Sequence, residues 1–323
     1  MNLTNFTGIS LPLAVWLAAD GYDFHPGATK AISVTSLLKS TRQILLQERL
    51  TDDTRVPTDV SDLIPSRLGH TIHDGMEKAW KSDYKESMRK LGYPESVIQR
   101  IAINPETVTN SMIPVYIEQR YSRIYRGYRI SGKFDMIMEG EVHDFKSTST
   151  FAFKGGKDED YRLQGSMYRW LNQDKVTADH MIIHFIFTDW MKAMARANPS
   201  YPQQRIMDHR VELYPVDQIQ KWIDDKLDAL EAAAELPEDK LPFCTDKELW
   251  REDPVWKYYS DPAKANTPGA RSSKNFDNAT EAHAHLREKK GKGAILEVSG
   301  KVKACGYCAA FPICSQKDLY DHG

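Results

Sequence analysis

The stretch that decides the fold runs from Gly132 to Lys146 and reads Gly-Lys-Phe-Asp-Met-Ile-Met-Glu-Gly-Glu-Val-His-Asp-Phe-Lys. It predicts a β-hairpin that ends in Asp144-Phe145-Lys146 and carries Asp135 on the partner strand. Because side chains alternate along a strand, Asp144 and Lys146 are expected on one face of the sheet and Phe145 in the core. Two carboxylates beside an ammonium suit a divalent cation that holds a phosphate and its attacking water. They also fit an ordinary solvated ion pair on a half-exposed strand.

Upstream of this hairpin, the sequence predicts a helix over residues 65–91. Its apolar residues recur at helical spacing, as Leu68, Ile72, Met76 and Trp80 show, and Pro65 suits a first helical turn. His73 lies on a flank of this apolar stripe, one turn after Gly69. A glycine there lets another backbone or an ion approach closely. His73 is therefore a candidate metal ligand, with a packed or surface histidine as the alternative.

A second helix is predicted downstream, around Tyr161-Arg-Leu-Gln-Gly-Ser-Met-Tyr-Arg-Trp-Leu171. Gln164 and Tyr168 are four residues apart and share one face of it. They either support the lysine of the hairpin, contact a nucleic-acid backbone, or belong to an ordinary amphipathic helix.

The order of these motifs resembles the PD-(D/E)XK nuclease superfamily. The motifs are Gly-x-x-x-His at 69–73, Gly-x-x-Asp at 132–135, Asp-x-Lys at 144–146 and Gln-x-x-x-Tyr at 164–168. More narrowly, the chain looks like the RecB/AddB-type branch and the related CRISPR-associated and phage exonucleases. Phe134 stands where the superfamily's name has proline.

The resemblance implies a role for each motif residue. His73, Asp135 and Asp144 become metal ligands, with the carbonyl of Phe145 as a backbone ligand. Lys146 orients or activates water and stabilises the charge that develops on the phosphate. Gln164 and Tyr168 form the supporting motif. Glu118, on the strand before the hairpin, is a further candidate acidic ligand or an ordinary surface residue.

The four cysteines form the second group of candidate ligands. Cys305, Cys308 and Cys314 make a C-x2-C-x5-C triple, and Cys244 precedes them. Four thiolates complete a tetrahedral zinc site or hold an iron–sulfur cluster. Disulfides are not expected, because the chain shows no secretory signal and points to a reducing compartment.

The cysteine triple resembles the iron–sulfur staple of AddB-type and CRISPR-associated exonucleases. The resemblance implies a [4Fe-4S] cluster that pins the C-terminal segment to the rest of the protein, with structural Zn²⁺ as the alternative. In those families the fourth cysteine typically precedes the nuclease motifs, whereas Cys244 follows them.

Composition and charge narrow the class of protein. The chain has 323 residues, of which 41% are hydrophobic and 27% charged, and a net charge of −2. No apolar run reaches membrane-spanning length, so we expect no membrane partner. The resemblance implies a cytoplasmic protein of a bacterial or phage-infected cell. The sequence has no phosphate-loop motif of a motor. A helicase or recombination protein that works with this chain would be a separate polypeptide.

Two basic stretches bear on nucleic-acid binding. From Arg120 to Lys133, five basic residues interleave with three tyrosines and no acid. Such a stretch favours a single-strand groove and equally a Tyr/Arg ladder across an exposed hairpin. Further basic residues at 287–292 and 301–303 flank the cysteine triple.

The fold class expected from these patterns is α/β, with a mixed central sheet flanked by helices. Residues 1–30 are expected to be irregular, and a single helix follows Ser33. Strands are expected near 113–119, 121–130, 131–138, 141–147, 181–188 and 205–213, and a helix over 216–235. We expect three segments. Residues 1–64 are helical or irregular, and residues 65–236 form a nuclease core that the resemblance implies is restriction-endonuclease-like. Residues 237–323 form a loop-rich, metal-stapled segment with few apolar residues for a core of its own.

The sequence thus predicts a divalent-metal-dependent DNA nuclease. Exonuclease is favoured because the resembling branch is largely exonucleolytic, and the expected partner is DNA that is single-stranded or has free ends. The cation would be Mg²⁺ or Mn²⁺. The alternative is a non-catalytic nucleic-acid-binding or assembly protein that retains the nuclease fold.

Overall fold

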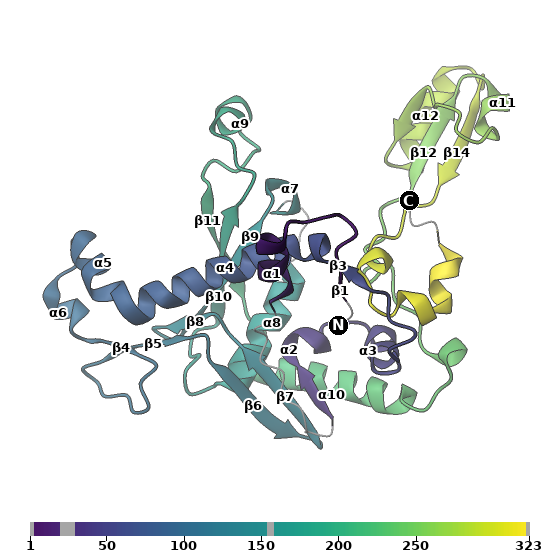
Figure 1. Ribbon diagram of the computed structural model, residues 1–323. Coiled ribbons are helices and arrows are strands. Elements are labelled where there is room, and N and C mark those ends of the chain that lie inside the picture. The colour runs from purple at the N-terminus through teal and green to yellow at the C-terminus, as the bar shows by residue number, and fades with distance from the viewer. Residues whose placement is uncertain (1–2, 20–29, 154–157, 321–323) are drawn as a thin grey trace. The chain divides into compact units, whose positions relative to one another are not determined.

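A computed structural model describes residues 3–19, 30–153 and 158–320 of the chain (Figure 1). The chain forms two compact units, one composed of Met1–Leu38 and Pro57–Asp228, the other of Lys39–Val56 and Ala229–Gly323. Residues 39–56 therefore fold with the C-terminal part of the chain, although they precede the whole predicted nuclease core. These units are defined by compactness and differ from the three sequence segments, whose functional boundaries stay a prediction.

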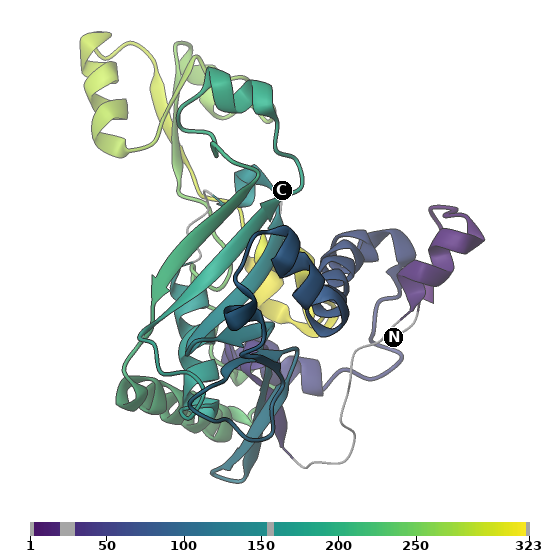
Figure 2. The same ribbon diagram turned by 90° about the vertical axis from the view of Figure 1, so that its left-hand side faces the viewer.

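The first unit is built on a six-stranded mixed sheet with the strand order β11-β10-β9-β8-β5-β4 (Figures 1 and 2). Its strands are β4 (Ile101–Ile103), β5 (Ile113–Ile117), β8 (Met136–Met138), β9 (Glu141–Thr148), β10 (His180–Phe187) and β11 (Ile206–Glu212). Strand β9 pairs in parallel with β10 and antiparallel with β8. The predicted class, α/β with a mixed sheet flanked by helices, is confirmed.

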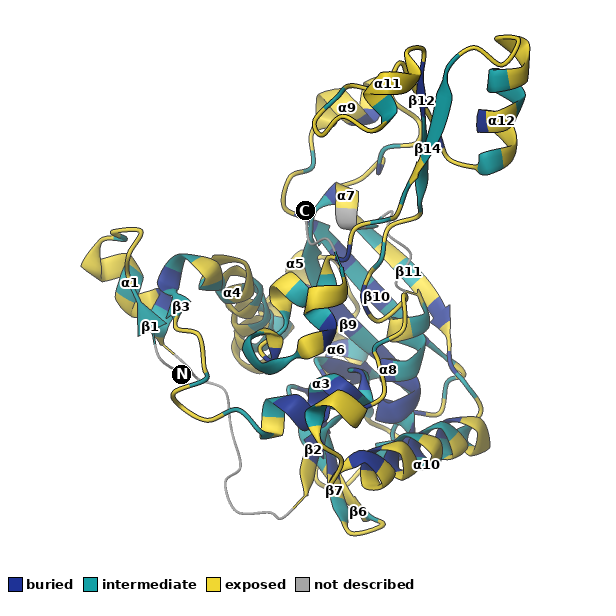
Figure 3. Ribbon diagram, turned by 90° about the vertical axis from the view of Figure 1, so that its right-hand side faces the viewer, coloured by how far each residue is buried: buried dark blue, intermediate teal, exposed yellow. Residues whose placement is uncertain are grey.

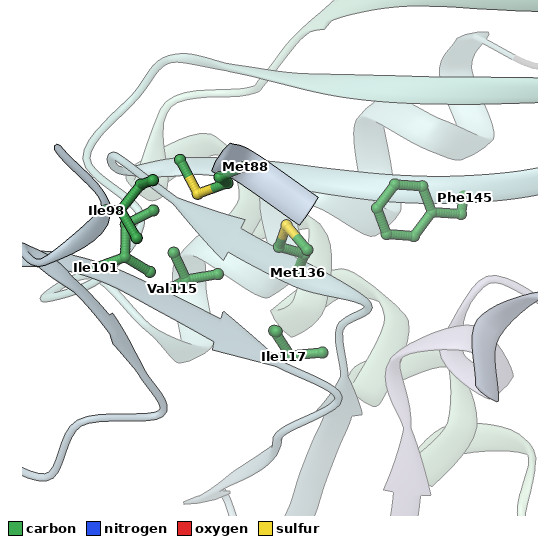
Figure 4. Packing of buried hydrophobic residues seen from close by; sticks show 7 residues of the cluster. All are labelled: Met88, Ile98, Ile101, Val115, Ile117, Met136 and Phe145. Carbon is green, nitrogen blue, oxygen red and sulfur yellow. The ribbon is translucent and has the colours of Figure 1, made fainter. Parts of the chain in front are cut away.

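The two faces of this sheet are covered by different helices. The predicted helix over 65–91 is confirmed as α4 (Ile64–Lys78), a π-helical turn over Ala79–Asp83 and α5 (Tyr84–Lys90). Its apolar side packs Met76 and Trp80 against a buried cluster that includes Phe145, so the prediction that Phe145 points into the core is confirmed (Figure 4). The opposite face, which carries Asp144, meets α8 (Asp158–Leu171) through Gln164.

The first unit also has a smaller sheet with the strand order β2-β7-β6. Its strands are β2 (Ala31–Ser33), β6 (Arg120–Tyr125) and β7 (Tyr128–Lys133). The strand expected over 121–130 was wrong. Arg126 and Gly127 have φ of 48° and 79°, which turns the chain into a tight hairpin at this point. Tyr121 stacks on Phe134, and the Tyr125 hydroxyl donates to Asp224. Tyr121 and Tyr125 therefore have partners within the protein, and the single-strand groove and the Tyr/Arg ladder both stay predictions.

The N-terminal region is more regular than expected. Residues 11–18 form helix α1 (Leu11–Ala18), which is mostly exposed, so the expectation of irregular structure was wrong there (Figure 3). The Arg67 guanidinium holds α1 by donating to the carbonyl of Leu17. The single helix expected after Ser33 is two helices, α2 (Val34–Leu37) and α3 (Thr41–Glu48), because Ser33 and Ser40 each cap a new first turn.

The remaining elements of the first unit are short or peripheral to the site. They are β1 (Leu3–Thr4), β3 (Thr58–Asp59), the 3₁₀ turn Val60–Leu63, α6 (Glu95–Ile98), α7 (Thr150–Phe153) and α9 (Lys192–Ala197). Helix α10 (Val216–Ala233) begins in the first unit and ends in the second.

The second unit contains a small sheet with a core of its own, contrary to the expectation for residues 237–323. Strands β12 (Val255–Tyr259), β13 (Lys274–Phe276) and β14 (Ala294–Val298) are antiparallel in the order β13-β12-β14. Tyr258, Phe276 and Ala282 of helix α12 (Ala279–Glu288) form the buried cluster. Two aromatic side chains on paired strands and one alanine on helix α12 are therefore enough to make this core.

The rest of the second unit contains helix α3, the end of α10 and several short elements. It contains α11 (Pro262–Ala265) and the 3₁₀ turns Glu238–Lys240, Ala304–Tyr307, Phe311–Ile313 and Ser315–Leu319, the last three of which carry or border the cysteine triple. Among the described residues, no helix combines the length and the apolar composition needed to cross a membrane.

Candidate active site

Three potential metal ligands converge from three different elements of the first unit. His73 comes from α4, Glu118 follows the last residue of β5, and Asp135 immediately precedes β8. His73 Nδ1 lies 3.4 Å from Asp135 Oδ1 and 3.5 Å from Glu118 Oε1. One ligand atom of each lies within 4.8 Å of the others. We call these three residues the ligand group.

The peptide of Phe145 holds two members of the ligand group in place. Its carbonyl lies 3.0 Å from His73 Nε2, and its N–H donates to Asp135 Oδ2 at 2.8 Å. Because a carbonyl only accepts, Nε2 carries the hydrogen and Nδ1 faces the carboxylates. Histidines that bind metals commonly donate their second N–H to such a carbonyl. The carbonyl of Phe145 thus orients His73; its predicted role as a metal ligand stays a prediction.

The electrostatics of the ligand group favour a cation between the carboxylates. Hydrogen bonds to Asp135 and Glu118 raise the pKa of His73 to about 10, against the opposing effect of burial. Burial disfavours the charge of Glu118, but His73 and Lys133 outweigh it and lower the pKa of that carboxyl. Lys133 Nζ lies 2.5 Å from Glu118 Oε2. Without a metal, an imidazolium therefore supplies the positive charge that these carboxylates attract.

Asp144 and Lys146 form an ion pair beside the ligand group. The Asp144 side chain is only 2% exposed, and its Oδ2 lies 2.6 Å from Lys146 Nζ. Burial raises the pKa of Asp144. Burial also disfavours the ammonium of Lys146, but Asp144 and Asp135 outweigh that effect and raise the pKa of the lysine. As predicted, both side chains lie on the face opposite Phe145.

Gln164 and Tyr168 support Asp144 rather than Lys146. The Gln164 amide donates to Asp144 Oδ1 at 3.4 Å and to the Tyr168 hydroxyl at 2.9 Å. The Tyr168 hydroxyl donates to the backbone carbonyl of Lys133 at 3.0 Å. These hydrogen bonds tie α8 to Asp144 and to the backbone of Lys133. Gln164 and Tyr168 had been predicted to support the lysine or to contact a nucleic-acid backbone, whereas Gln164 here contacts the carboxylate of Asp144.

All of these side chains line one cavity of about 550 Å³. Its lining also includes Arg120, Trp16, Arg67 and His70. The cavity therefore combines acidic groups with cations and an aromatic ring.

Glu118 is the residue whose importance the sequence signalled least. It adopts a left-handed backbone with φ of 52°, which costs a non-glycine residue about 1 kcal/mol. Its N–H donates to the carbonyl of Asp135 at 2.9 Å, so the strained turn is fastened to another ligand. Strain of this kind gathers at functional sites. An acid that ends an apolar strand was the one available signal.

All four cysteines belong to the second unit. Burial raises the pKa of Cys305 to about 11, and the thiols of Cys308, Cys314 and Cys244 add to that effect. All four are half-buried and none is in a disulfide. Within the described residues, no three cysteine sulfurs lie within 4.8 Å of one another. Four neighbouring thiols suit a metal centre in their chemistry.

Comparisons with known proteins give distant structural likenesses. No family model matches the chain, and no curated protein matches its sequence. Solved structures that match part of the chain include the protein SSO0001, with 17% identity, a TM-score of 0.40, and coverage of 69% of this chain and 86% of the other. A phage-related exonuclease from Haemophilus somnus 129PT matches with 16% identity and a TM-score of 0.25, over 36% of this chain and 57% of the other.

Proposed function

We propose that this chain is a divalent-metal-dependent DNA nuclease with a restriction-endonuclease-like core, and that it acts as an exonuclease. The observation that carries the proposal is the convergence of His73, Glu118 and Asp135 beside the Asp144–Lys146 pair in one cavity. An imidazole and several carboxylates can hold the cation that metal-assisted phosphodiester hydrolysis uses, and an ammonium beside them can stabilise phosphate charge.

The ligand group fits Mn²⁺ or Mg²⁺. Carboxylate oxygens suit both ions, and the imidazole of His73 favours manganese, because magnesium prefers oxygen ligands. When bound, the cation supplies a more acidic water and neutralises phosphate charge. Asp144 is the fourth candidate ligand, once its contact with Lys146 gives way.

Lys146 has the position of the residue that acts on the nucleophile. Its side chain is about one third exposed, at 32%, and lines the cavity, while its partner Asp144 is buried. From there it can hold a water by one hydrogen bond and stabilise a phosphate oxygen by its charge. Gln164 keeps Asp144 from rotating away.

The cavity wall supports a nucleic-acid strand as substrate. Arg67, Arg120 and Lys133 line the same cavity as the acidic groups and can neutralise phosphates of a bound strand. The volume of about 550 Å³ matches pockets that hold drug-sized ligands, roughly 300–1,000 Å³, and so accommodates one or two nucleotides of a single strand. We therefore place a single-stranded end in the cavity.

The cysteine centre is proposed to be structural, as a [4Fe-4S] cluster or a zinc site. We further propose a cytoplasmic setting in a bacterial or phage-infected cell, in recombination, processing or repair of DNA, with any motor on a separate chain.

End-labelled DNA tests the nuclease directly. Linear single-stranded, linear double-stranded and circular DNA are incubated with Mn²⁺, with and without EDTA. We expect loss of the linear substrates in Mn²⁺ alone, no cleavage by Lys146→Gln, and full activity of Lys221→Gln, a matched control whose lysine pairs with Asp225 on α10. Binding without cleavage would instead establish the non-catalytic alternative, and an active Lys146→Gln would refute the assignment of the site.

A further inference from the structure

Arg42 is a fully buried arginine, with a side chain that is 1% exposed. It lies in the first turn of α3, in the segment 39–56 that folds with the C-terminal part of the chain. A guanidinium remains charged at any physiological pH, and burying a charge is costly unless it is fully paired. The groups that pair with the Arg42 guanidinium therefore indicate which negative charge this buried site accommodates.

Each nitrogen of the Arg42 side chain has a partner in the second unit. Nη1 donates to the carbonyls of Glu238 and Leu241 at 3.2 and 3.1 Å. Nη2 contacts the Glu238 carboxylate and donates to Ser315 Oγ at 3.3 Å. Nε donates to Cys314 Sγ at 3.2 Å. A neutral thiol is a weak acceptor, whereas a thiolate accepts a charge-assisted hydrogen bond.

Ser40, two residues earlier, contacts a second cysteine. Its Oγ accepts from the N–H of Gln43 and thereby caps α3. The same Oγ lies 3.1 Å from Cys244 Sγ, so its hydroxyl hydrogen is available to that sulfur. The first turn of α3 thus approaches two of the four cysteines, which follow it by 204 and 272 positions in the sequence.

We propose that the first turn of α3 is the outer shell of the metal centre held by the four cysteines. Arg42 and Ser40 are positioning residues, which donate hydrogen bonds to the thiolates of Cys314 and Cys244. Four thiolates with Zn²⁺, or with an oxidised [4Fe-4S] cluster, carry a net charge of −2, and the guanidinium of Arg42 lowers the cost of burying it. The inference goes beyond the proposed nuclease activity, because neither residue lines the catalytic cavity.

The proposal also accounts for the unusual order of the cysteines. Cys244 follows the nuclease motifs, so no cysteine of the N-terminal region is left to join the centre. Segment 39–56 reaches the centre through hydrogen bonds instead. Loading the centre then fixes this segment, and removing the metal releases it.

Metal retention provides the first test. Arg42→Gln is compared with the wild type and with Arg49→Gln, whose arginine lies at the end of the same helix and donates to the carbonyl of Ala234 but touches no cysteine. Proteins are prepared without oxygen, iron and zinc are counted, and release to a coloured chelator is timed. We expect equal, slow release from the wild type and Arg49→Gln, and at least about tenfold faster release from Arg42→Gln, the lower end for loss of an outer-shell partner.

A second test uses the wild type alone and so does not depend on the folding of a variant. Trypsin cleavage after Arg42 and Arg49 is followed by mass spectrometry before and after chelation. We expect metal to protect both bonds and its removal to expose them. A chain without bound metal, equal release from Arg42→Gln and Arg49→Gln, or cleavage that ignores the metal would each overturn the proposal. These readouts are independent of DNA cleavage, so failure of the nuclease assignment would leave them intact.

Discussion

Binding of Mn²⁺ to the ligand group should displace a proton from His73. In the metal-free protein, Asp135 and Glu118 raise the pKa of this ring to about 10, so Nδ1 holds a proton at neutral pH. A metal needs the same nitrogen unprotonated. The proton and Mn²⁺ therefore compete for Nδ1. A change of pH tests this competition, because a ring that has lost its proton can bind the metal.

The magnitude follows from that pKa. Well below pH 10, the apparent affinity for Mn²⁺ rises about tenfold for each unit of pH, which gives about 100-fold between pH 6.5 and 8.5. Over the same range, each Mn²⁺ bound releases about one proton. A histidine with an ordinary pKa near 6.5 would instead give only about a twofold change in affinity, because half of its rings are already neutral at the lower pH.

Two measurements decide between these cases. Free Mn²⁺ is counted by electron paramagnetic resonance in anaerobic titrations, and proton release is followed with an indicator dye in weak buffer. His73→Gln is the matched control, because it removes the titrating ring; we expect weaker binding with little dependence on pH. An affinity of the wild type that changes less than about threefold, or equal proton release from His73→Gln, would refute the placement of His73 in the metal site.

Three further perturbations probe the support of the site, each measured by urea unfolding in EDTA. Asp144→Ala removes the ion-pair partner of Lys146; because the lysine side chain is 32% exposed, we expect a loss of about 2 kcal/mol, below the cost for a fully buried pair, and an unchanged midpoint would contradict the ion pair. Tyr168→Phe removes the hydroxyl that joins α8 to Lys133 and should cost about 1 kcal/mol, with no loss arguing against that hydrogen bond. Gly132→Ala would place a Cβ 2.9 Å from the Tyr168 ring and 3.0 Å from Val34, so about 1–3 kcal/mol is expected, whereas a neutral result would show that the ring can move.

Local features of the site were predictable from the sequence. Strand alternation placed Phe145 in the core and Asp144 with Lys146 on the other face, because the period of two residues is a property of any strand. Helical spacing likewise predicted the long helix that carries His73. Each of these predictions depended on residues that are near one another in the chain.

What escaped prediction depends on contacts between distant residues. Glu118 joins the ligand group because a left-handed turn after β5 aims it at Asp135, and nothing in its neighbours demands that turn. The sequence around Arg42 does not indicate that its side chain is buried, because arginines in helices are usually exposed. Its partner Cys314 lies 272 residues away. The small core around Tyr258 was not predicted either, because loop-forming residues separate its three buried side chains in the sequence.

The arrangement around Phe145 explains why the site and the hydrophobic core cannot vary independently. Its ring packs in the cluster beneath α4, its carbonyl fixes His73 and its N–H fixes Asp135. The neighbouring Asp144 points the other way and is held by Gln164 of α8. Helices on opposite faces of the sheet therefore set the two halves of the ligand arrangement through a single dipeptide. A shift of either helix against the sheet would separate the imidazole from the carboxylates, so the packing of apolar side chains is what keeps the charged groups close enough to share one cation.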